Sequence, residues 1–374
     1  MKHSDRNMAS RAVINRVKGS LIAGAAGDAL GYVVEFMRLG DIKETYGENG
    51  ITEYDLKPKF LSQSGMGFIS DDTQMTLFTA NGILMHDANH DNSLAYYVYL
   101  AYLDWMMTQT DTDRLIMQAY KRKKAKYAHY TWLYEIPELH HRRAPGNTCM
   151  TALMSGEMGT IKAPLNDSKG CGGVMRVAPV ALRYIPENDD DFRTIDTYGA
   201  EIAAITHGHD LGWLPAALLT HIIARVMQDC PLTEAIRDAV KMNQDLFSGI
   251  ISGKHFDEMN DLIEFAIKLA RSNHDDARNI HEIGGGWTGD EALAIALYCA
   301  LKYHDDFSQA LIASVNHSGD SDSTGAVAGN IIGAMLGYDA IADKWKDNLE
   351  LKNIILELAD DLCSDSWPEG KYSR

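Results

Sequence analysis

The chain has 374 residues, of which 45% are hydrophobic and 23% charged, and this composition is typical of a soluble globular protein. Its formal net charge of −17 argues against a nonspecific nucleic-acid binder, because such binding needs clustered lysine and arginine. The five cysteines show no C-x-x-C spacing, so we expect neither a disulfide framework nor a structural zinc site. These properties favour a cytoplasmic protein with reduced thiols, whose partners are small molecules or other proteins.

The N-terminal residues 1–14 are polar, and we expect them to form an arm before one helical domain of residues 15–374. Basic residues then precede an apolar run near Leu21, as they do in a secretory signal peptide. Asp28 interrupts that run after roughly eight residues, so a signal peptide is not expected. No run approaches the ~20 apolar residues of a transmembrane helix, which predicts that the protein has no membrane partner.

The dominant pattern along the chain is helical, with apolar residues recurring at three- and four-residue spacing. The clearest helical stretches are Met75–Met85, Leu94–Met107, Leu214–Met227, Leu232–Gln244 and Asp290–Tyr303. Strand-like alternation is confined to Gly50–Leu56 and Met66–Ser70. No proline- or serine-rich linker divides the chain. The sequence therefore predicts an all-α fold, a single compact multi-helix domain with roughly ten to fifteen helices.

Two predicted helices are built largely from small residues. Glycine recurs every fourth residue from Gly325 to Gly337, and the stretch Gly19–Gly31 has the same character. Each glycine costs about 1 kcal/mol of helix stability relative to alanine, so close packing must compensate. We expect both helices at the crowded centre of the domain, packed against each other.

Two acidic motifs stand at the predicted starts of helices. Asp320–Gly325 has the first ligand spacing of an EF-hand, but position 12 is Ile331 instead of glutamate, which excludes that motif. Ser70–Thr73 repeats the same oxygen-rich chemistry, and either motif alone is an ordinary helix cap. If the two converge, four carboxylates repel and need neutralising, and two hard divalent cations such as Mg²⁺, Mn²⁺ or Ca²⁺ would balance them. We treat this convergence as a hypothesis.

Seven stretches occur in this order along the chain: "GSLIAGAAGDALGYVVEF", "SDDTQM", "PGNTC", "SKGCGGVMRVAPVAL", "THGHD", "GGGWTGDEALAIALYCAL" and "SGDSDSTGAVAGNIIGA". With these motifs in this order, the chain resembles the ADP-ribosylglycohydrolase family, which contains the dinitrogenase-reductase-activating glycohydrolases and the ADP-ribosyl-arginine hydrolases. The resemblance extends from about residue 16 to about residue 340. It implies an all-α fold with a binuclear metal centre that uses Mg²⁺ or, alternatively, Mn²⁺.

The resemblance also implies roles for individual residues. The metal ligands that it implies are the acidic and hydroxyl residues Ser70, Asp71, Asp72, Asp320, Asp322 and Ser323. The candidate catalytic residues are Asp72, Glu35 and Asp322, of which Asp322 would bridge the ions. Either Asp72 or Glu35 would act as general base. A surface or salt-bridged glutamate is the alternative interpretation of Glu35.

The glycine-rich turn of "SKGCGGVMR" matches the substrate loop of the family, where backbone N–H groups approach a diphosphate. The candidate substrate-binding residues are Ser168, Lys169, Gly170, Gly172, Gly173 and His207. Cys171 replaces an asparagine found in some relatives. No Cys/His set accompanies His207 and His209, so zinc is not expected. Trp287 is predicted to be a packing residue or a pocket wall.

The resulting hypothesis is a hydrolase that cleaves the N-glycosidic bond between ADP-ribose and a protein arginine, with two divalent cations as cofactors. Within enzymes, the alternatives are serine-linked ADP-ribose, acetylated ADP-ribose and a nucleic-acid adduct. From another class, the alternative is an immunity protein that binds a partner ADP-ribosyltransferase toxin, with the N-terminal arm as a contact. A family member that kept the fold but lost activity is the remaining alternative.

Overall fold

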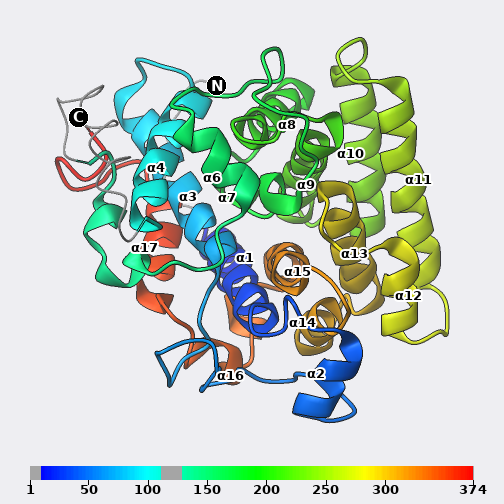
Figure 1. The fold of residues 1–374 in the computed structure, drawn as a ribbon. Coiled ribbons are helices and arrows are strands. Elements are labelled where there is room, and N and C mark those ends of the chain that lie inside the picture. Colours follow the sequence, from blue (N-terminus) through cyan, green and yellow to red (C-terminus); the bar gives the residue numbers. More distant parts are fainter. Residues whose placement is uncertain (1–9, 111–128, 374) are drawn as a thin grey trace.

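The computed structural model describes residues 10–110 and 129–373, and this part of the chain is built from helices (Figure 1). Sixteen α-helices and four short 3-10 helices lie in the described residues, slightly more than expected. The α-helices are α1 (Arg11–Gly31), α2 (Leu39–Tyr46), α3 (Asp71–Asn89), α4 (Leu94–Thr108), α6 (Asn147–Met154), α7 (Ala178–Arg183), α8 (Asp189–Ala204), α9 (Asp210–Val226), α10 (Leu232–Leu246), α11 (Gly253–Ala270), α12 (Asp276–Ile283), α13 (Gly289–Lys302), α14 (Phe307–Val315), α15 (Ser321–Leu336), α16 (Asp343–Lys346) and α17 (Lys352–Leu362). The all-α prediction is confirmed, and the predicted helical stretches correspond to α3, α4, α9, α10 and α13.

The two predicted strands are wrong. In the first stretch, the side chain of Asn316 both donates to and accepts from the backbone of Ile51, each at 2.8 Å, where a neighbouring strand would bind. The second stretch forms one isolated bridge between Gly67 and Leu349. The ladder stops there because a carboxylate of Glu350 takes the next available backbone N–H, that of Ile69, at 3.1 Å. In both stretches, side chains form hydrogen bonds with backbone groups that a neighbouring strand would otherwise bind.

The small-residue helices α1 and α15 pack against each other at the centre of the molecule, as predicted (Figure 1). A methyl group on Gly27 would lie 2.0 Å from the carbonyl oxygen of Gly325, and one on Gly19 would lie 2.4 Å from that of Gly333. No side chain fits at such distances, so glycine is required by the close approach of the two backbones. The pairing is antiparallel, and the C-terminal end of α1 therefore meets the N-terminal end of α15.

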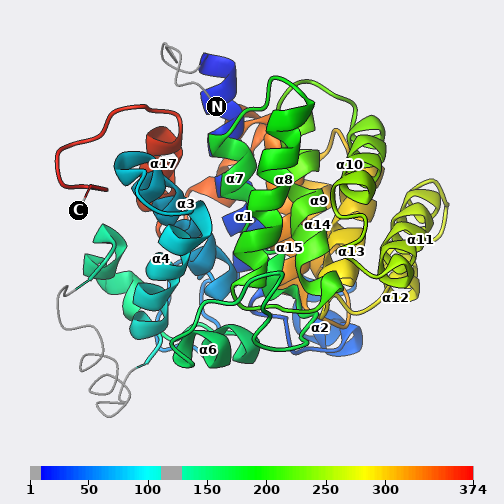
Figure 2. The same ribbon diagram turned by 90° about the horizontal axis from the view of Figure 1, so that it is seen from above.

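The remaining helices surround this central pair (Figures 1 and 2). Helices α3, α4 and α17 lie on one side of it, and α8 to α13 lie on the other. Helix α1 begins at Arg11, while residues 1–9 of the expected arm lie outside the described residues. In the described part of the chain, no helix combines the length and the apolar character that crossing a bilayer requires.

Three helix ends meet at one place and define the candidate site. Helix α3 begins after Ser70, whose hydroxyl accepts the N–H of Asp72 at 3.2 Å. Helix α15 begins after Asp320, whose carboxylate accepts the N–H of Ser323 at 3.3 Å. Both residues are side-chain caps, as their types predict. Because α1 ends beside α15, the turn that follows α1 also reaches this place.

Candidate active site

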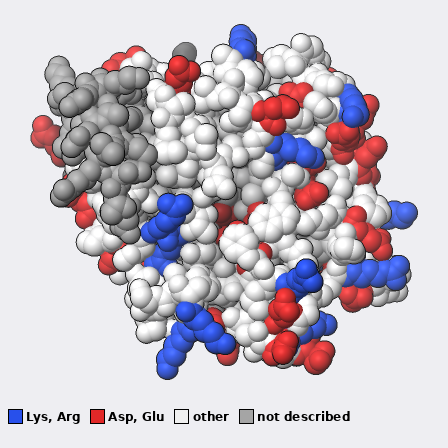
Figure 3. Space-filling view, in the orientation of Figure 1, with Lys and Arg blue, Asp and Glu red and all other residues white. Residues whose placement is uncertain are grey.

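The two acidic helix starts meet at one cavity of about 420 Å³. Five carboxylates line it: Asp71 and Asp72 from α3, Asp320 and Asp322 from the start of α15, and Glu35 from the turn after α1. In the space-filling view of this face, acidic atoms show between uncharged side chains near the centre (Figure 3). The convergence on which the metal hypothesis depends is therefore present in the fold.

Asp28 joins the end of α1 to the start of α3. Its fully buried carboxylate accepts the N–H of Ser70 at 2.9 Å and the N–H of Thr73 at 3.0 Å, together with the Thr73 hydroxyl. Burial and the nearby charge of Asp322 raise the pKa of Asp28 to about 7. From the sequence, Asp28 was only the acid that interrupts an apolar run, and its role in the site was missed. An acid within an otherwise apolar helix is the signal that could have identified it.

A loop and a C-terminal segment hold Asp71 in place. The backbone N–H of Asp71 donates to the carbonyl of Arg143 at 3.0 Å, and its carboxylate accepts the N–H of Gly146 at 3.0 Å. The Arg143 guanidinium forms a buried ion pair with Glu350 at 2.7 Å. Glu350 also accepts the N–H of Ile69, so one ion pair fixes the segment immediately before α3.

On the opposite wall, the start of α15 holds its own carboxylates. The N–H of Asp320 donates to the carbonyl of Gly285 at 2.8 Å, and the Cys171 thiol donates to its carboxylate at 2.7 Å. Asp322 accepts the N–H of Ser323 at 2.9 Å. Carboxylate oxygens of Glu35, Asp320 and Asp322 all lie within 4.8 Å of one another, which is close enough for them to share a cation.

The cluster is short of positive charge. Buried oxygens of Glu35 (Oε2) and Asp72 (Oδ2) have no hydrogen-bond partner among the described residues. Burial first, and then the charges of Asp322, Asp320 and Asp71, raise the pKa of Glu35 to about 11. Burial, followed by the charge of Asp322, likewise raises the pKa of Asp72 well above its usual value. An all-oxygen set with orphaned acceptors and mutual repulsion fits hard divalent cations.

The two serines of the predicted ligand set are placed differently. Ser323 lines the cavity, so its hydroxyl lies beside the carboxylates. Ser70 is fully buried, and its hydroxyl caps α3 by accepting the N–H of Asp72. Ser70 is therefore held in the same hydrogen-bonded unit as the ligands of α3.

The predicted substrate loop lies beside the acidic wall. Gly170 and Gly172 line the cavity, whereas Gly173 is buried against the carbonyl of Gly212. The N–H of Gly170 donates within the loop, to the Ser168 hydroxyl at 3.3 Å. Gly172 also lines the cavity, and its N–H is not used in the bond to Ser168 that occupies the N–H of Gly170.

The polar side chains of the predicted substrate set take separate positions. The Lys169 ammonium lies 3.4 Å from Asp290 and is half-exposed, outside the cavity wall. His207 lines the cavity, and its Nδ1 lies 2.9 Å from the Thr206 hydroxyl. Burial, together with the charge of Arg176, lowers the pKa of His207 to about 3, so this imidazole is neutral at pH 7.

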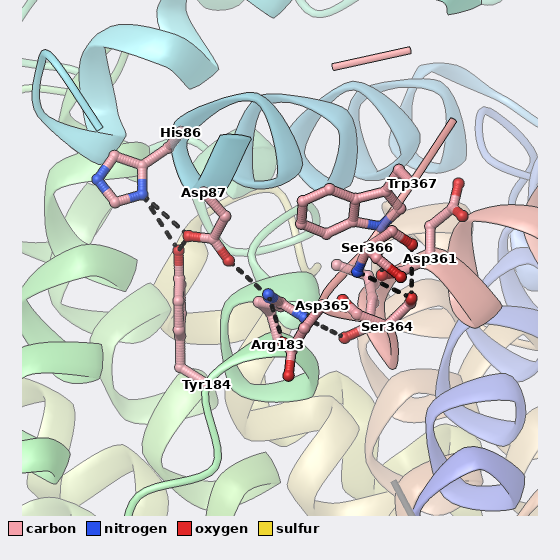
Figure 4. A network of polar contacts seen from close by, with 10 residues as sticks. His86, Asp87, Arg183, Tyr184, Asp361, Ser364, Asp365, Ser366 and Trp367 are labelled. Carbon is pink, nitrogen blue, oxygen red and sulfur yellow. Dashed lines mark hydrogen bonds and ion pairs between the residues drawn. The ribbon is translucent and has the colours of Figure 1, made fainter. Parts of the chain in front are cut away.

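The far end of α3 carries a buried carboxylate of the opposite kind (Figure 4). Asp87 accepts from Arg183 at 2.6 Å and from the Tyr184 hydroxyl at 2.7 Å, and the His86 ring nitrogen lies 3.1 Å away. Burial alone would raise the pKa of Asp87, but the bond to His86 and the charge of Arg183 outweigh it and lower the pKa to about 2. Arg183 also donates to Asp365, which fastens the C-terminal segment.

The fold and the cavity together define a helical protein with a buried carboxylate cluster at the meeting point of three helix ends. The model of the family described as ADP-ribosylglycohydrolase matches residues 9–370, and the chain belongs to this family.

Named relatives agree with this assignment. The ADP-ribosyl-[dinitrogen reductase] glycohydrolase of Rhodospirillum rubrum is 27% identical over 354 residues, which cover 92% of this chain and 94% of that protein. ADP-ribosylhydrolase ARH3 of Mus musculus is 23% identical over 202 residues, covering 49% of this chain and 53% of that protein. A solved structure described as an ADP-ribosylglycohydrolase-related protein complex has the same fold, with a TM-score of 0.56, 23% identity and coverage of 94% of this chain and 98% of that one. The family and its relatives support an ADP-ribosylhydrolase activity.

Proposed function

We propose that this protein is a metal-dependent hydrolase that releases ADP-ribose from ADP-ribosylated arginine side chains of proteins. The observation that carries the proposal is the convergence of four aspartates from two helix starts on one cavity, with buried carboxylate oxygens left unpaired. A chain keeps such a cluster at a cost in stability, because each buried charge without a partner is unfavourable. A bound ligand that needs the cluster explains its presence.

The residues fit a pair of divalent cations. Four carboxylates carry a charge of about −4, and two such ions carry +4, which removes the repulsion within the cluster. Asp71, Asp72, Asp320 and Asp322 would hold the ions, with hydroxyl help from the two serines of the motifs. Mg²⁺ is our first choice and Mn²⁺ the second, because the donors are all oxygen. When bound, such ions supply Lewis-acid polarisation of ribose hydroxyls and water.

The chain itself supplies the remaining chemistry. Glu35 and Asp72 each present an unpaired carboxylate oxygen, and either can accept the proton of the attacking water. The negative charge of Asp322 and its neighbours stabilises the positive charge that develops at the anomeric carbon of the ribose. The arginine guanidine then leaves with a proton from solvent.

Two features of the wall suit a diphosphate. Gly172 brings backbone to the cavity surface, where a side chain would collide with His207. Arg142, which our sequence analysis did not single out, is exposed, lines the cavity and adds a guanidinium that matches phosphate geometry. The neutral His207 beside them can donate or accept a hydrogen bond without adding charge.

The test is an assay panel of arginine-linked, serine-linked and acetyl-linked ADP-ribose, run with and without a chelator. We expect release from the arginine linkage, its loss on chelation and its recovery on addition of Mg²⁺. Full activity after chelation, or release from the serine linkage alone, would contradict the proposal.

We place the protein in the cytoplasm, in line with its five free cysteines. No contact of the described residues favours the toxin-binding alternative, and most of the arm it invoked lies outside them.

A further inference from the structure

Two exposed aromatic side chains stand at the rim of the cavity. Phe36 is 75% exposed and Trp287 is 46% exposed, and both contribute to the cavity wall. Their rings stack with centroids 5.9 Å apart and planes 23° from parallel. The other large apolar side chains exposed in the described residues are not part of the cavity wall. We refer to Phe36 and Trp287 together as the rim shelf.

The rim shelf is attached to the acidic centre on both sides. Phe36 directly follows Glu35, whose carboxylate lies in the cavity. The carbonyl of Trp287 accepts the N–H of Cys171 at 3.2 Å, and Gly285, two residues earlier, accepts the N–H of Asp320 at 2.8 Å. The backbone on each side is thus fixed to elements that carry the carboxylates. Solvent-exposed aromatic surface held this firmly beside a cavity marks a binding surface.

We propose that the rim shelf binds the planar guanidinium of the modified arginine and so selects the arginine linkage. This inference rests on the proposed function and names the side-chain class that the site accepts. A guanidinium is flat, delocalised and weakly hydrated, and it stacks on aromatic faces.

Charge complementarity supports the same occupant. The unpaired oxygen of Glu35, next to the shelf in sequence, provides an acceptor for a guanidinium N–H. Of the five carboxylates in the cavity wall, the four aspartates would be balanced by the two cations, which leaves Glu35 as the carboxylate available to the guanidinium. A serine linkage offers neither a plane nor a charge, and a lysine offers a charge without a plane.

The first experiment measures binding of agmatine, a small guanidinium compound, by calorimetry. We expect Phe36→Leu and Trp287→Leu to weaken agmatine binding by about 3- to 30-fold, the range of a cation–π contact. Phe36→Tyr should retain binding because it keeps the aromatic face. Phe60→Leu is the matched control, since Phe60 is also exposed, at 56%, but lies outside the cavity wall. Putrescine, a cation without a plane, should lose less affinity than agmatine in each leucine variant.

The second experiment separates the shelf from the rest of the site. For the arginine-linked substrate we expect KM to rise by about 3- to 30-fold in both leucine variants, while the affinity for free ADP-ribose stays within about twofold. Unchanged agmatine binding in both variants would overturn the proposal. A parallel loss of ADP-ribose affinity would also overturn it, because the shelf would then hold the adenine. If the wild type hydrolyses no linkage, the proposed function fails, and agmatine binding still decides the role of the shelf.

Discussion

Helix α3 carries buried carboxylates at both of its ends, and the two ends are completed in different ways. In the last turn, Asp87 is surrounded by Arg183, Tyr184 and His86, and its pKa is lowered to about 2. In the first turn, Asp71 and Asp72 face three further carboxylates, and burial raises the pKa of each of them. The far end has a cationic partner in Arg183, whereas at the near end an oxygen of Asp72 has no hydrogen-bond partner among the described residues.

The difference separates a structural acid from a functional one. Buried polar groups in folded proteins are almost always paired, so an unpaired cluster calls for a specific explanation. The Asp87 network holds the C-terminal segment on α3 and α7 through Arg183 (Figure 4). The cluster at the other end is also buried, and no cation among the described residues is placed against Asp72 as Arg183 is against Asp87, which suits a site for bound cations.

The largest effect is expected in the carboxylate cluster of the cavity. Asp320→Asn removes a candidate ligand and a negative charge from the cavity while keeping its shape. We expect ADP-ribose release to fall by about 1,000-fold or more, with little change in fold. Single-turnover assays measure the rate of ADP-ribose release, and circular dichroism controls for the fold. Activity within tenfold of wild type would contradict a role for Asp320 in the site.

At the paired end the same change should act on stability. Asp87→Asn leaves the buried Arg183 with only part of its negative partners, and we expect a loss of about 3 kcal/mol in the free energy of unfolding. The catalytic rate at saturating substrate should remain close to wild type. Urea denaturation measures the effect, and a loss under 1 kcal/mol would show that the Asp365 pair suffices.

A smaller effect is expected at the thiol that binds Asp320. Cys171→Ala removes the donor to this carboxylate, and we expect Mn²⁺ affinity to fall by about five- to tenfold. Cys171→Ser keeps a donor and should lie within about threefold of wild type. Calorimetric Mn²⁺ titrations decide the point, and equal affinities for the two variants would leave the thiol without a positioning role.

The smallest expected effect is on how the free energy of unfolding depends on pH. In chelator, groups with raised pKa values such as Glu35, at about 11, keep their protons longer in the folded state, so stability should fall as pH rises from 5 to about 9. Asp72→Asn should stabilise this metal-free protein by about 1 kcal/mol, the usual size of a single-residue effect.

Asp87 has the opposite effect on stability, because its pKa is lowered to about 2 in the folded state. Its contribution to the free energy of unfolding is lost as pH falls below about 4. Urea denaturation at a series of pH values from below about 4 to about 9 measures both effects. A metal-free protein whose stability rises steadily from pH 5 to 9 would contradict the account of the carboxylate cluster.

Much of the fold was predictable because its signals are local. Helical periodicity predicted α3, α4, α9, α10 and α13. The recurrent glycines predicted that α1 and α15 pack against each other at the centre. The strand prediction at residues 50–56 failed because Asn316, 265 residues away, binds the backbone there. A side chain so distant leaves no trace in the local pattern.

The candidate site divides in the same way. The aspartate pairs were recognisable by their spacing at two helix starts, whereas the residues that hold them were not. Asp28 reaches Ser70 across 42 positions, and Glu350 reaches Ile69 across 281. Such contacts arise only when the chain folds, so composition and periodicity do not contain them.

The central claim is that the four aspartates at the two helix starts form one site for a pair of divalent cations. Anomalous X-ray diffraction from crystals soaked in Mn²⁺ tests it most directly. The account predicts two strong anomalous peaks between Asp71 and Asp72 on one side and Asp320 and Asp322 on the other, with reduced occupancy in Asp320→Asn. An absence of peaks in the cavity at saturating Mn²⁺, or peaks only on the outer surface, would contradict it.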